Sequence, residues 1–117
     1  MCNFAKIFIV ILLTSILSYS PVSFSANISL SICEYVAADD KKRLRSFLKS
    51  NHLKIRKIFK DLRCNHQNLL IFAAASGSLS TGELIIRKLS KKIVRNNLSE
   101  LEKLSPELLA EAKKRVE

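Results

Sequence analysis

The chain has 117 residues, of which 20 are Lys or Arg and 10 are Asp or Glu, so its formal net charge is +10. This length allows at most one domain, and its two glycines are too few to build a glycine-rich loop that cradles phosphate. Apolar residues recur at spacings of three and four, and β-branched alternation is scarce. This pattern predicts an all-α fold.

The first 25 residues have the layout of a secretory signal peptide. Lys6 is their only charged residue, the apolar run 7–17 follows it, and small residues with Pro21 lead to an expected cleavage after Ser25. We therefore expect a periplasmic or secreted protein that touches a membrane only through this segment before cleavage. An uncleaved anchor stays open, although the apolar run is shorter than the roughly 20 residues that span a bilayer.

The rest of the chain is expected to form a small helical domain at residues 26–90 and a C-terminal helical extension at residues 91–117. Cys2 leaves with the signal peptide, so Cys33 and Cys64 remain as an even pair. In an oxidising compartment such a pair predicts a disulfide. Closing the loop between the two cysteines would stabilise the fold by roughly 3–4 kcal/mol, mainly by restricting the unfolded chain.

N-terminal capping patterns mark the first two predicted helices. Ser31 and Glu34 are spaced as a capping box, which predicts a short first helix beginning at Ser31. Asp39 and Asp40 both suit an N-cap, so a second helix is expected to follow them and to run to about Lys49.

A third helix is predicted just before Cys64, because four apolar residues there share one helical face. They are Ile55, Ile58, Phe59 and Leu62. An irregular connector is the alternative for this segment.

A fully apolar helix is predicted next, with Asn68 as its N-cap and Gly77 just beyond its C-terminal end. Ser80 and Glu83 form another capping box that predicts the following helix. In that helix Glu83 can pair with Arg87 one turn later.

Two more helix starts are predicted in the tail. Ser99 with Glu102 is one, and Ser105 followed by Pro106 at the first helical position is the other. The last helix has few apolar residues and is expected to dock weakly on the rest of the fold or to fray.

Two stretches resemble ankyrin repeats. Residues 68–89 follow the helix–turn–helix pattern in which alanines and a glycine precede a leucine-rich second helix. Residues 32–48 follow it more loosely, with Asp39 and Asp40 at the turn. The usual Thr-Pro-Leu-His start is absent. The resemblance implies a short array of helical hairpins, here stapled by the disulfide and followed by a C-terminal helix.

The exported part also resembles a family of short bacterial proteins catalogued as a domain of unknown function, DUF3718. The resemblance rests on three runs: Cys33-x-x-Val36-Ala37-Ala38-Asp39-Asp40, then Arg63-Cys64-Asn65, then Leu69-Leu70-x-Phe72-Ala73. It implies a periplasmic location and a paired Cys33 and Cys64, and it brings no known activity.

Patterns that carry catalysis or metal binding are weak. Cys64 and His66 could form a thiol–imidazole pair, but a disulfide cysteine near a solvated histidine explains them better. Cys33 and Cys64 with His52 and His66 are a chemically valid zinc set, yet their spacing matches no short zinc motif. We therefore expect a protein that is not an enzyme and that has no metal or cofactor.

The basic charge is concentrated in one segment, since ten basic residues and one acid lie between positions 41 and 63. A solvated surface with no ligand is one explanation of such a segment. The other is a surface that binds an anion or a partner, and eight of the basic residues are its candidates: Lys41, Lys42, Arg45, Lys49, Arg56, Lys57, Lys60 and Arg63.

Two functions fit these features. The first is a non-catalytic interaction module that binds another envelope protein through the ankyrin-like surface and residues 51–63. The second is a polyanion-binding envelope protein, whose ligand is lipopolysaccharide phosphate or anionic lipid rather than nucleic acid. An exported toxin or inhibitor stays open as a third. The helix–turn–helix pattern is more specific than a charge count, which favours the interaction module.

Overall fold

The computed structural model describes residues 25–117, so the predicted signal peptide lies outside the described residues except for Ser25. The described part is all-α, as predicted, with eight helices and one isolated bridge between Cys64 and Gln67. The helices are α2 (Ala26–Ala37), α3 (Lys41–Ser50), α4 (Ile55–Ile58), α5 (Leu69–Ala75), α6 (Leu79–Lys88), α7 (Lys91–Asn96), α8 (Leu98–Leu104) and α9 (Pro106–Val116).

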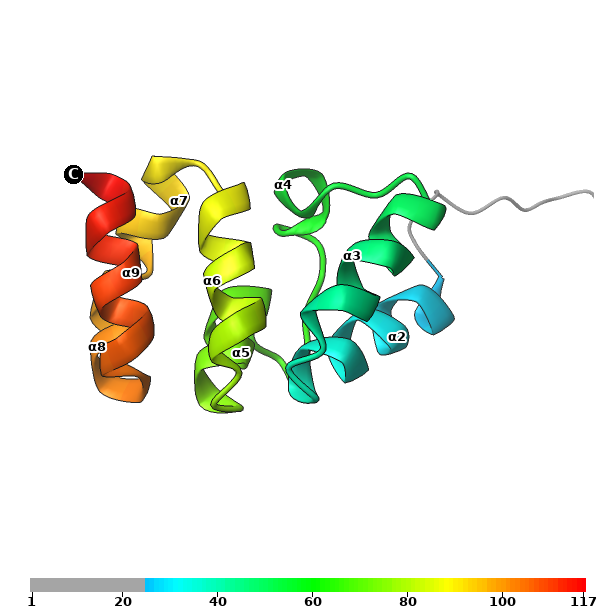
Figure 1. The fold of residues 1–117 in the computed structure, drawn as a ribbon, viewed down its shortest axis with the longest axis horizontal. Coiled ribbons are helices and arrows are strands. Elements are labelled where there is room, and N and C mark those ends of the chain that lie inside the picture. Colours follow the sequence, from blue (N-terminus) through cyan, green and yellow to red (C-terminus); the bar gives the residue numbers. More distant parts are fainter. Residues whose placement is uncertain (1–24) are drawn as a thin grey trace, which may run out of the picture.

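Six of these helices form three hairpins, α2–α3, α5–α6 and α8–α9, which stand side by side along the molecule (Figure 1). Within the stack α5 packs against α2 and α8, while α6 packs against α3 and α9. The short helices α4 and α7 lie in the connections between successive hairpins. The result is a linear array in which each hairpin contacts its neighbours.

One continuous apolar core runs through all three hairpins. Leu44 of the first hairpin, Leu70 of the second and Leu101 of the third are each fully buried. Because the core is shared, each hairpin covers apolar surface on the next one, which is how short helices become stable in a folded protein.

The first hairpin begins earlier than predicted. Helix α2 starts at Ala26, and the side chain of Ser25 accepts a hydrogen bond from the N–H of Ile28 as its N-cap. Ser31 therefore lies inside the helix, and the predicted capping box at Ser31 and Glu34 was wrong. Helix α3 begins as predicted, with the Asp40 carboxylate accepting from the N–H of Arg43 at 3.1 Å.

The connection after α3 is only partly helical. Helix α4 is a single turn, although Ile55, Ile58 and the next two predicted apolar positions are all buried. Further along, the chain makes a tight turn in which Asn65 and His66 both have positive φ, between the paired residues Cys64 and Gln67. That turn brings Cys64 to α2.

The second hairpin agrees closely with the prediction. The side chain of Asn68 accepts from the N–H of Ile71 at 2.8 Å, and Gly77 adopts the left-handed conformation with φ 71° just after α5. Glycine adopts this conformation without a Cβ clash, which explains its place at the turn. The predicted capping box at Ser80 and Glu83 was wrong, because α6 already begins at Leu79.

The last three helices include one that was not predicted. Helix α7 is capped by the Ser90 side chain, which accepts from the N–H of Ile93 at 3.3 Å. Helix α8 begins at Leu98, after Asn97, and not at the predicted Ser99. The start of α9 was predicted correctly, since Ser105 caps it and proline occupies the first position.

The expectation that α9 docks weakly was wrong. Leu108 and Ala112 are buried, and α9 packs against α6, α7 and α8. None of the helices in residues 25–117 is both long and apolar enough to cross a membrane.

Candidate functional site

A cleft of about 480 Å³ opens between α3, the start of α4 and α6. These three elements belong to two hairpins and to the connection between them, so the cleft exists only in the folded array. It is lined by Arg45, Leu48, Lys49, Leu53, Lys54, Ile55, Arg56, Leu84, Arg87 and Lys88.

The floor of the cleft is aliphatic and is already well packed. Leu48, Ile55 and Leu84 retain 7%, 3% and 3% of their accessible surface. A ligand in the cleft can therefore cover little additional apolar area, and the hydrophobic contribution to binding scales with that area. Recognition has to come mainly from the polar groups around the floor.

The rim of the cleft carries one sign of charge. Six lining side chains are cationic, and none of the lining side chains in the described part of the chain is acidic. Walls of one sign and low dielectric concentrate the electrostatic field in a cleft and attract ligands of opposite charge. The cationic residues are Arg45, Lys49, Lys54, Arg56, Arg87 and Lys88.

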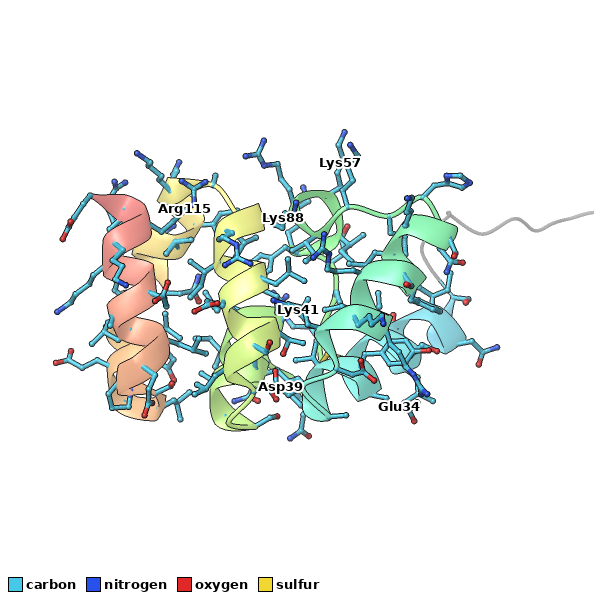
Figure 2. The ribbon with its side chains drawn as sticks, in the orientation of Figure 1. Glu34, Asp39, Lys41, Lys57, Lys88 and Arg115 are labelled. Atoms are coloured by element: carbon cyan, nitrogen blue, oxygen red, sulfur yellow. A yellow bond between two sulfur atoms is a disulfide. The ribbon has the colours of Figure 1, made fainter. Side chains whose placement is uncertain are left out.

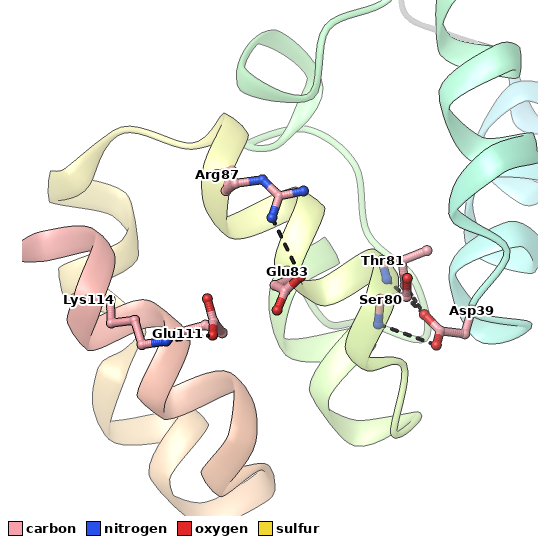
Figure 3. Close-up of polar contacts among 7 residues, drawn as sticks. All are labelled: Asp39, Ser80, Thr81, Glu83, Arg87, Glu111 and Lys114. Atoms are coloured by element: carbon pink, nitrogen blue, oxygen red, sulfur yellow. Dashed lines mark hydrogen bonds and ion pairs between the residues drawn. The ribbon is translucent and has the colours of Figure 1, made fainter.

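One rim cation has an internal partner. Arg87 Nη1 lies 3.5 Å from Glu83 Oε1, the i, i+4 pair that the sequence predicted (Figure 3). Both side chains are substantially exposed, and such surface pairs contribute little to stability. A ligand carboxylate can therefore replace Glu83 at Arg87 at small cost.

The cleft includes only three of the eight basic residues predicted from the sequence. Arg45, Lys49 and Arg56 line the cleft. The other five predicted residues do not line it: Lys41, Lys42, Lys57, Lys60 and Arg63. Arg63 donates instead to the carbonyl of Leu62 at 3.0 Å.

Three rim residues were missed by sequence reasoning. Lys54 is in the predicted basic segment but was not assigned to either helical face. Arg87 and Lys88 are in the last turn of α6, more than thirty residues from Lys54 in the sequence. The basic end of an amphipathic helix was a visible signal, but only the packing of α6 beside α3 gives it a role in this cleft.

The two long walls of the cleft, α3 and α6, are joined to each other at their N-terminal ends, away from the cleft. Asp39, which precedes α3, accepts hydrogen bonds from Thr81 N at 2.7 Å, Thr81 Oγ1 at 3.1 Å and Ser80 N at 3.3 Å (Figure 3). The carboxylate thus caps α6, a helix in a different hairpin. Asp39 has φ 56°, and Thr81 is fully buried. The hydrogen bonds between them hold the first turn of α6 against the start of α3.

The third wall of the cleft is the connection that contains α4, and the disulfide holds it in place. Cys33 on α2 and Cys64 are bonded as predicted, with their Cα atoms 5.7 Å apart. The bond ties the segment after α4 to the first hairpin. Within the connection, Leu53 N donates to Leu48 O at 2.8 Å and Ile58 N donates to Lys54 O at 3.1 Å.

The two histidines stand at exposed turns. His52 and His66 both have positive φ, in the connection after α3 and in the turn before α5. Both cysteines of the zinc set weighed from the sequence are consumed by the disulfide. Among residues 25–117 no group of three or more His, Cys, Asp or Glu side chains is placed to hold a metal ion.

Comparison with known proteins places the chain by sequence. A family model described as "Protein of unknown function (DUF3718)" matches residues 32–96, more than half of the chain. The match includes both cysteines and every residue that lines the cleft. No curated protein and no solved structure matches, so the ankyrin-like arrangement stays a prediction.

Proposed function

The chain belongs to the DUF3718 family, and we propose that this member is a non-catalytic interaction module that binds an acidic segment of another protein in the cleft between α3, α4 and α6. The observation that carries the proposal is the rim of six cations around a small aliphatic floor, with no acid among the described residues that line it. The proposal keeps the exported location expected from the first 25 residues, so the partner would be a protein of the cell envelope.

Charge is the main source of recognition in this proposal. Three of the rim cations are arginines, Arg45, Arg56 and Arg87. A guanidinium group presents a planar set of donors that matches a carboxylate with two parallel hydrogen bonds. Carboxylates spaced along an extended peptide could meet arginines on α3, on α4 and on α6 in turn.

The shape of the cleft favours a peptide over a lipid chain. An acyl chain needs an apolar cavity to cover it, whereas Leu48, Ile55 and Leu84 are already almost fully buried. The volume of about 480 Å³ is within the range of about 300–1,000 Å³ that is usual for ligand sites. It accommodates a few side chains of an extended peptide, whose carboxylates meet the cations of the rim.

The cleft is organised before a ligand arrives. Asp39 joins the starts of α3 and α6, and the Cys33–Cys64 disulfide holds the connection between them. Pre-organisation lowers the entropy lost on binding. The module would therefore bind its partner without ordering a loop.

The proposal is tested by titrating the purified protein with a synthetic peptide of alternating Glu and Leu while recording backbone amide NMR spectra. We expect the largest shifts at the ends of α3 and α6 and in residues 53–56. The K49E/K54E variant should weaken binding at least about tenfold, since removing charged partners typically costs more than about 1.4 kcal/mol.

The matched control is K41E/K42E, which makes the same change of charge in α3 outside the cleft. It should retain binding within about threefold, the effect of net charge alone at moderate salt. Equal weakening by both variants, or shifts spread over the whole surface, would reject the cleft as the site. Binding of inorganic polyphosphate in preference to the peptide would support the polyanion function instead.

A further inference from the structure

A second basic surface lies along one edge of the array. It shares only Lys88 with the lining of the cleft. Helices α4, α6 and α9 end at this edge, and α7 begins there (Figure 1). Lys57, Lys88 and Arg115 come from three of these ends and lie along the same side of the molecule (Figure 2). We define the basic edge as Lys57, Lys88, Lys91, Lys92 and Arg115.

The opposite edge differs in charge. It contains the hairpin turns, with Asp39 and Asp40 before α3 and Glu107 in the first turn of α9. Figure 2 shows Asp39 on the side away from Lys57 and Lys88. Acids are not absent from the basic edge, because Glu117 ends α9 there. The edge with the hairpin turns is of mixed sign, because Lys41 and Lys42 begin α3 there and Lys103 lies in the last turn of α8.

Helix stabilisation explains only part of this pattern. Cations in the last turn of a helix interact favourably with its dipole, which accounts for Lys57, Lys88 and Arg115. Arg115 also donates to the carbonyl of Leu89 at 3.0 Å. Lys91 and Lys92 are different, because they occupy the first two positions of α7, where the dipole disfavours cations.

The start of α3 shows how unusual the α7 pair is. Lys41 and Lys42 also occupy the first two helical positions, but two acids, Asp39 and Asp40, come directly before them. Only the uncharged Ser90 precedes Lys91, and α7 has no acid in its first turn. Lys91 and Lys92 are therefore exposed, and no acid next to them in the chain offsets their charge. This is expected of side chains that meet an external anion.

We propose that the basic edge rests on the surface of a lipid bilayer that contains anionic headgroups. A row of cations on one edge, drawn from four elements of a linear array, matches a flat negative surface better than a compact ligand. The exposed leucines of α6 and α8, Leu79 and Leu104, are at the ends that face the hairpin turns, so the contact would be electrostatic. This surface contact goes beyond the peptide binding proposed for the cleft.

The test is co-sedimentation of the disulfide-bonded protein with vesicles of phosphatidylcholine mixed with phosphatidylglycerol, and with phosphatidylcholine alone. We expect binding to the anionic vesicles only, with loss at high salt. Each cation near an anionic surface contributes about fivefold to the binding constant, so K91E/K92E should lower it by about 25-fold or more.

Two variants serve as controls for this test. K41E/K42E reverses a lysine pair at the same two positions of another helix and should change vesicle binding by less than about threefold. K49E/K54E changes the cleft and should leave most vesicle binding intact while it weakens peptide binding at least about tenfold, so the two proposals can fail separately. Glutamate is favourable at both helix starts, so neither lysine-pair variant is expected to unfold.

The inference is overturned if the wild-type protein does not bind the anionic vesicles at low salt. It is also overturned if K91E/K92E and K41E/K42E weaken binding equally, since this would show a response to net charge rather than to the edge.

Discussion

Capping side chains show what a single residue can do in this fold. Asn68, Ser90 and Ser105 each accept a hydrogen bond from the N–H three residues later, which satisfies a donor that the helix itself cannot. This contact is local, and the caps at Asn68 and Ser105 were therefore predictable from the sequence. Ser90 carries the same signal but precedes two lysines and few apolar residues, and its helix was missed.

Asp39 shows where local patterns fail. The sequence placed it beside Asp40 as a cap for α3, but its carboxylate caps α6, with Thr81 42 residues away. A capping contact between hairpins depends on how the helices stack, and no spacing in the sequence reveals it. The same packing made the capping box at Ser80 unnecessary.

Replacing Asp39 tests this contact. Asp39→Ala removes three hydrogen bonds and a residue type that tolerates positive φ, so we expect the free energy of unfolding to fall by about 2–3 kcal/mol. Asp40→Ala removes one cap bond and should cost about 1 kcal/mol. Urea unfolding measures both. Equal losses would show that Asp39 acts only as an ordinary surface acid.

At the scale of elements, a glycine explains how α9 docks with so few apolar residues. A Cβ atom added to Gly82 in α6 would lie 2.6 Å from Leu108 Cδ1 and 2.9 Å from Leu108 Cδ2. Glycine inside a helix is normally unfavourable by roughly 0.5–1 kcal/mol relative to alanine. Here it lets the buried Leu108 approach the backbone of α6, and the close contact replaces the wide apolar face that the sequence of α9 lacks.

Gly82→Ala should therefore destabilise the protein despite its better helix propensity. Overpacking typically costs about 1–3 kcal/mol, which exceeds the gain in propensity. In a Leu108→Ala background the same change should cost nothing or become favourable, because the clashing atoms are gone. A double-mutant cycle by thermal unfolding measures the coupling. Strict additivity of the two substitutions would contradict the close contact.

The disulfide acts on the irregular connection rather than on a helix. Residues 51–68 contain only one helical turn, and Cys64 fastens their far end to α2. The paired cysteines could be predicted by counting, and the buried apolar positions by periodicity. The end of α4 could not, because the helical spacing of buried apolar residues continues to Phe59 and Leu62, beyond the point where the helix ends.

Removing the disulfide should weaken both stability and the cleft wall. For a separation of 31 residues, C33S/C64S should lower the free energy of unfolding by about 3–4 kcal/mol. We also expect faster trypsin cleavage in residues 54–63 than elsewhere in the chain, because this segment then lacks its covalent attachment. Cleavage at the same rate in both proteins would show that packing alone holds the connection.

At the scale of the whole molecule, stacking brings together the residues that line the cleft. The all-α class followed from periodicity and the disulfide from the cysteine count, whereas helical hairpins were expected from the resemblance to ankyrin repeats. The cleft did not follow, because its walls come from α3 and α6 in different hairpins. Five of the eight predicted basic residues lie outside it for the same reason: the sequence groups charges by segment, whereas the fold groups them by neighbouring helices.

The basic edge is also a property of the whole array. Each hairpin has its turn at one edge, and helices α6 and α9 end at the other (Figure 1). Cations at the ends of α6 and α9 then add up across the hairpins. Within a single helix, a cation in the last turn interacts favourably with the helix dipole. In the stack, such cations from several helices form one extended basic edge beside the basic cleft.

The most direct test of the cleft as a binding site is a photo-crosslinking experiment in the producing cells. Leu53 lines the cleft and is partly buried, so a photo-reactive leucine analogue there leaves every rim charge in place. The control position is Leu30 on α2, which does not line the cleft and is 57% exposed.

We predict that the analogue at position 53 is crosslinked to one protein, at a segment rich in Asp or Glu when mapped by mass spectrometry. The adduct should disappear in the K49E/K54E background and should be absent from position 30. Adducts with lipid or saccharide alone, or the same protein captured equally from both positions, would contradict the account.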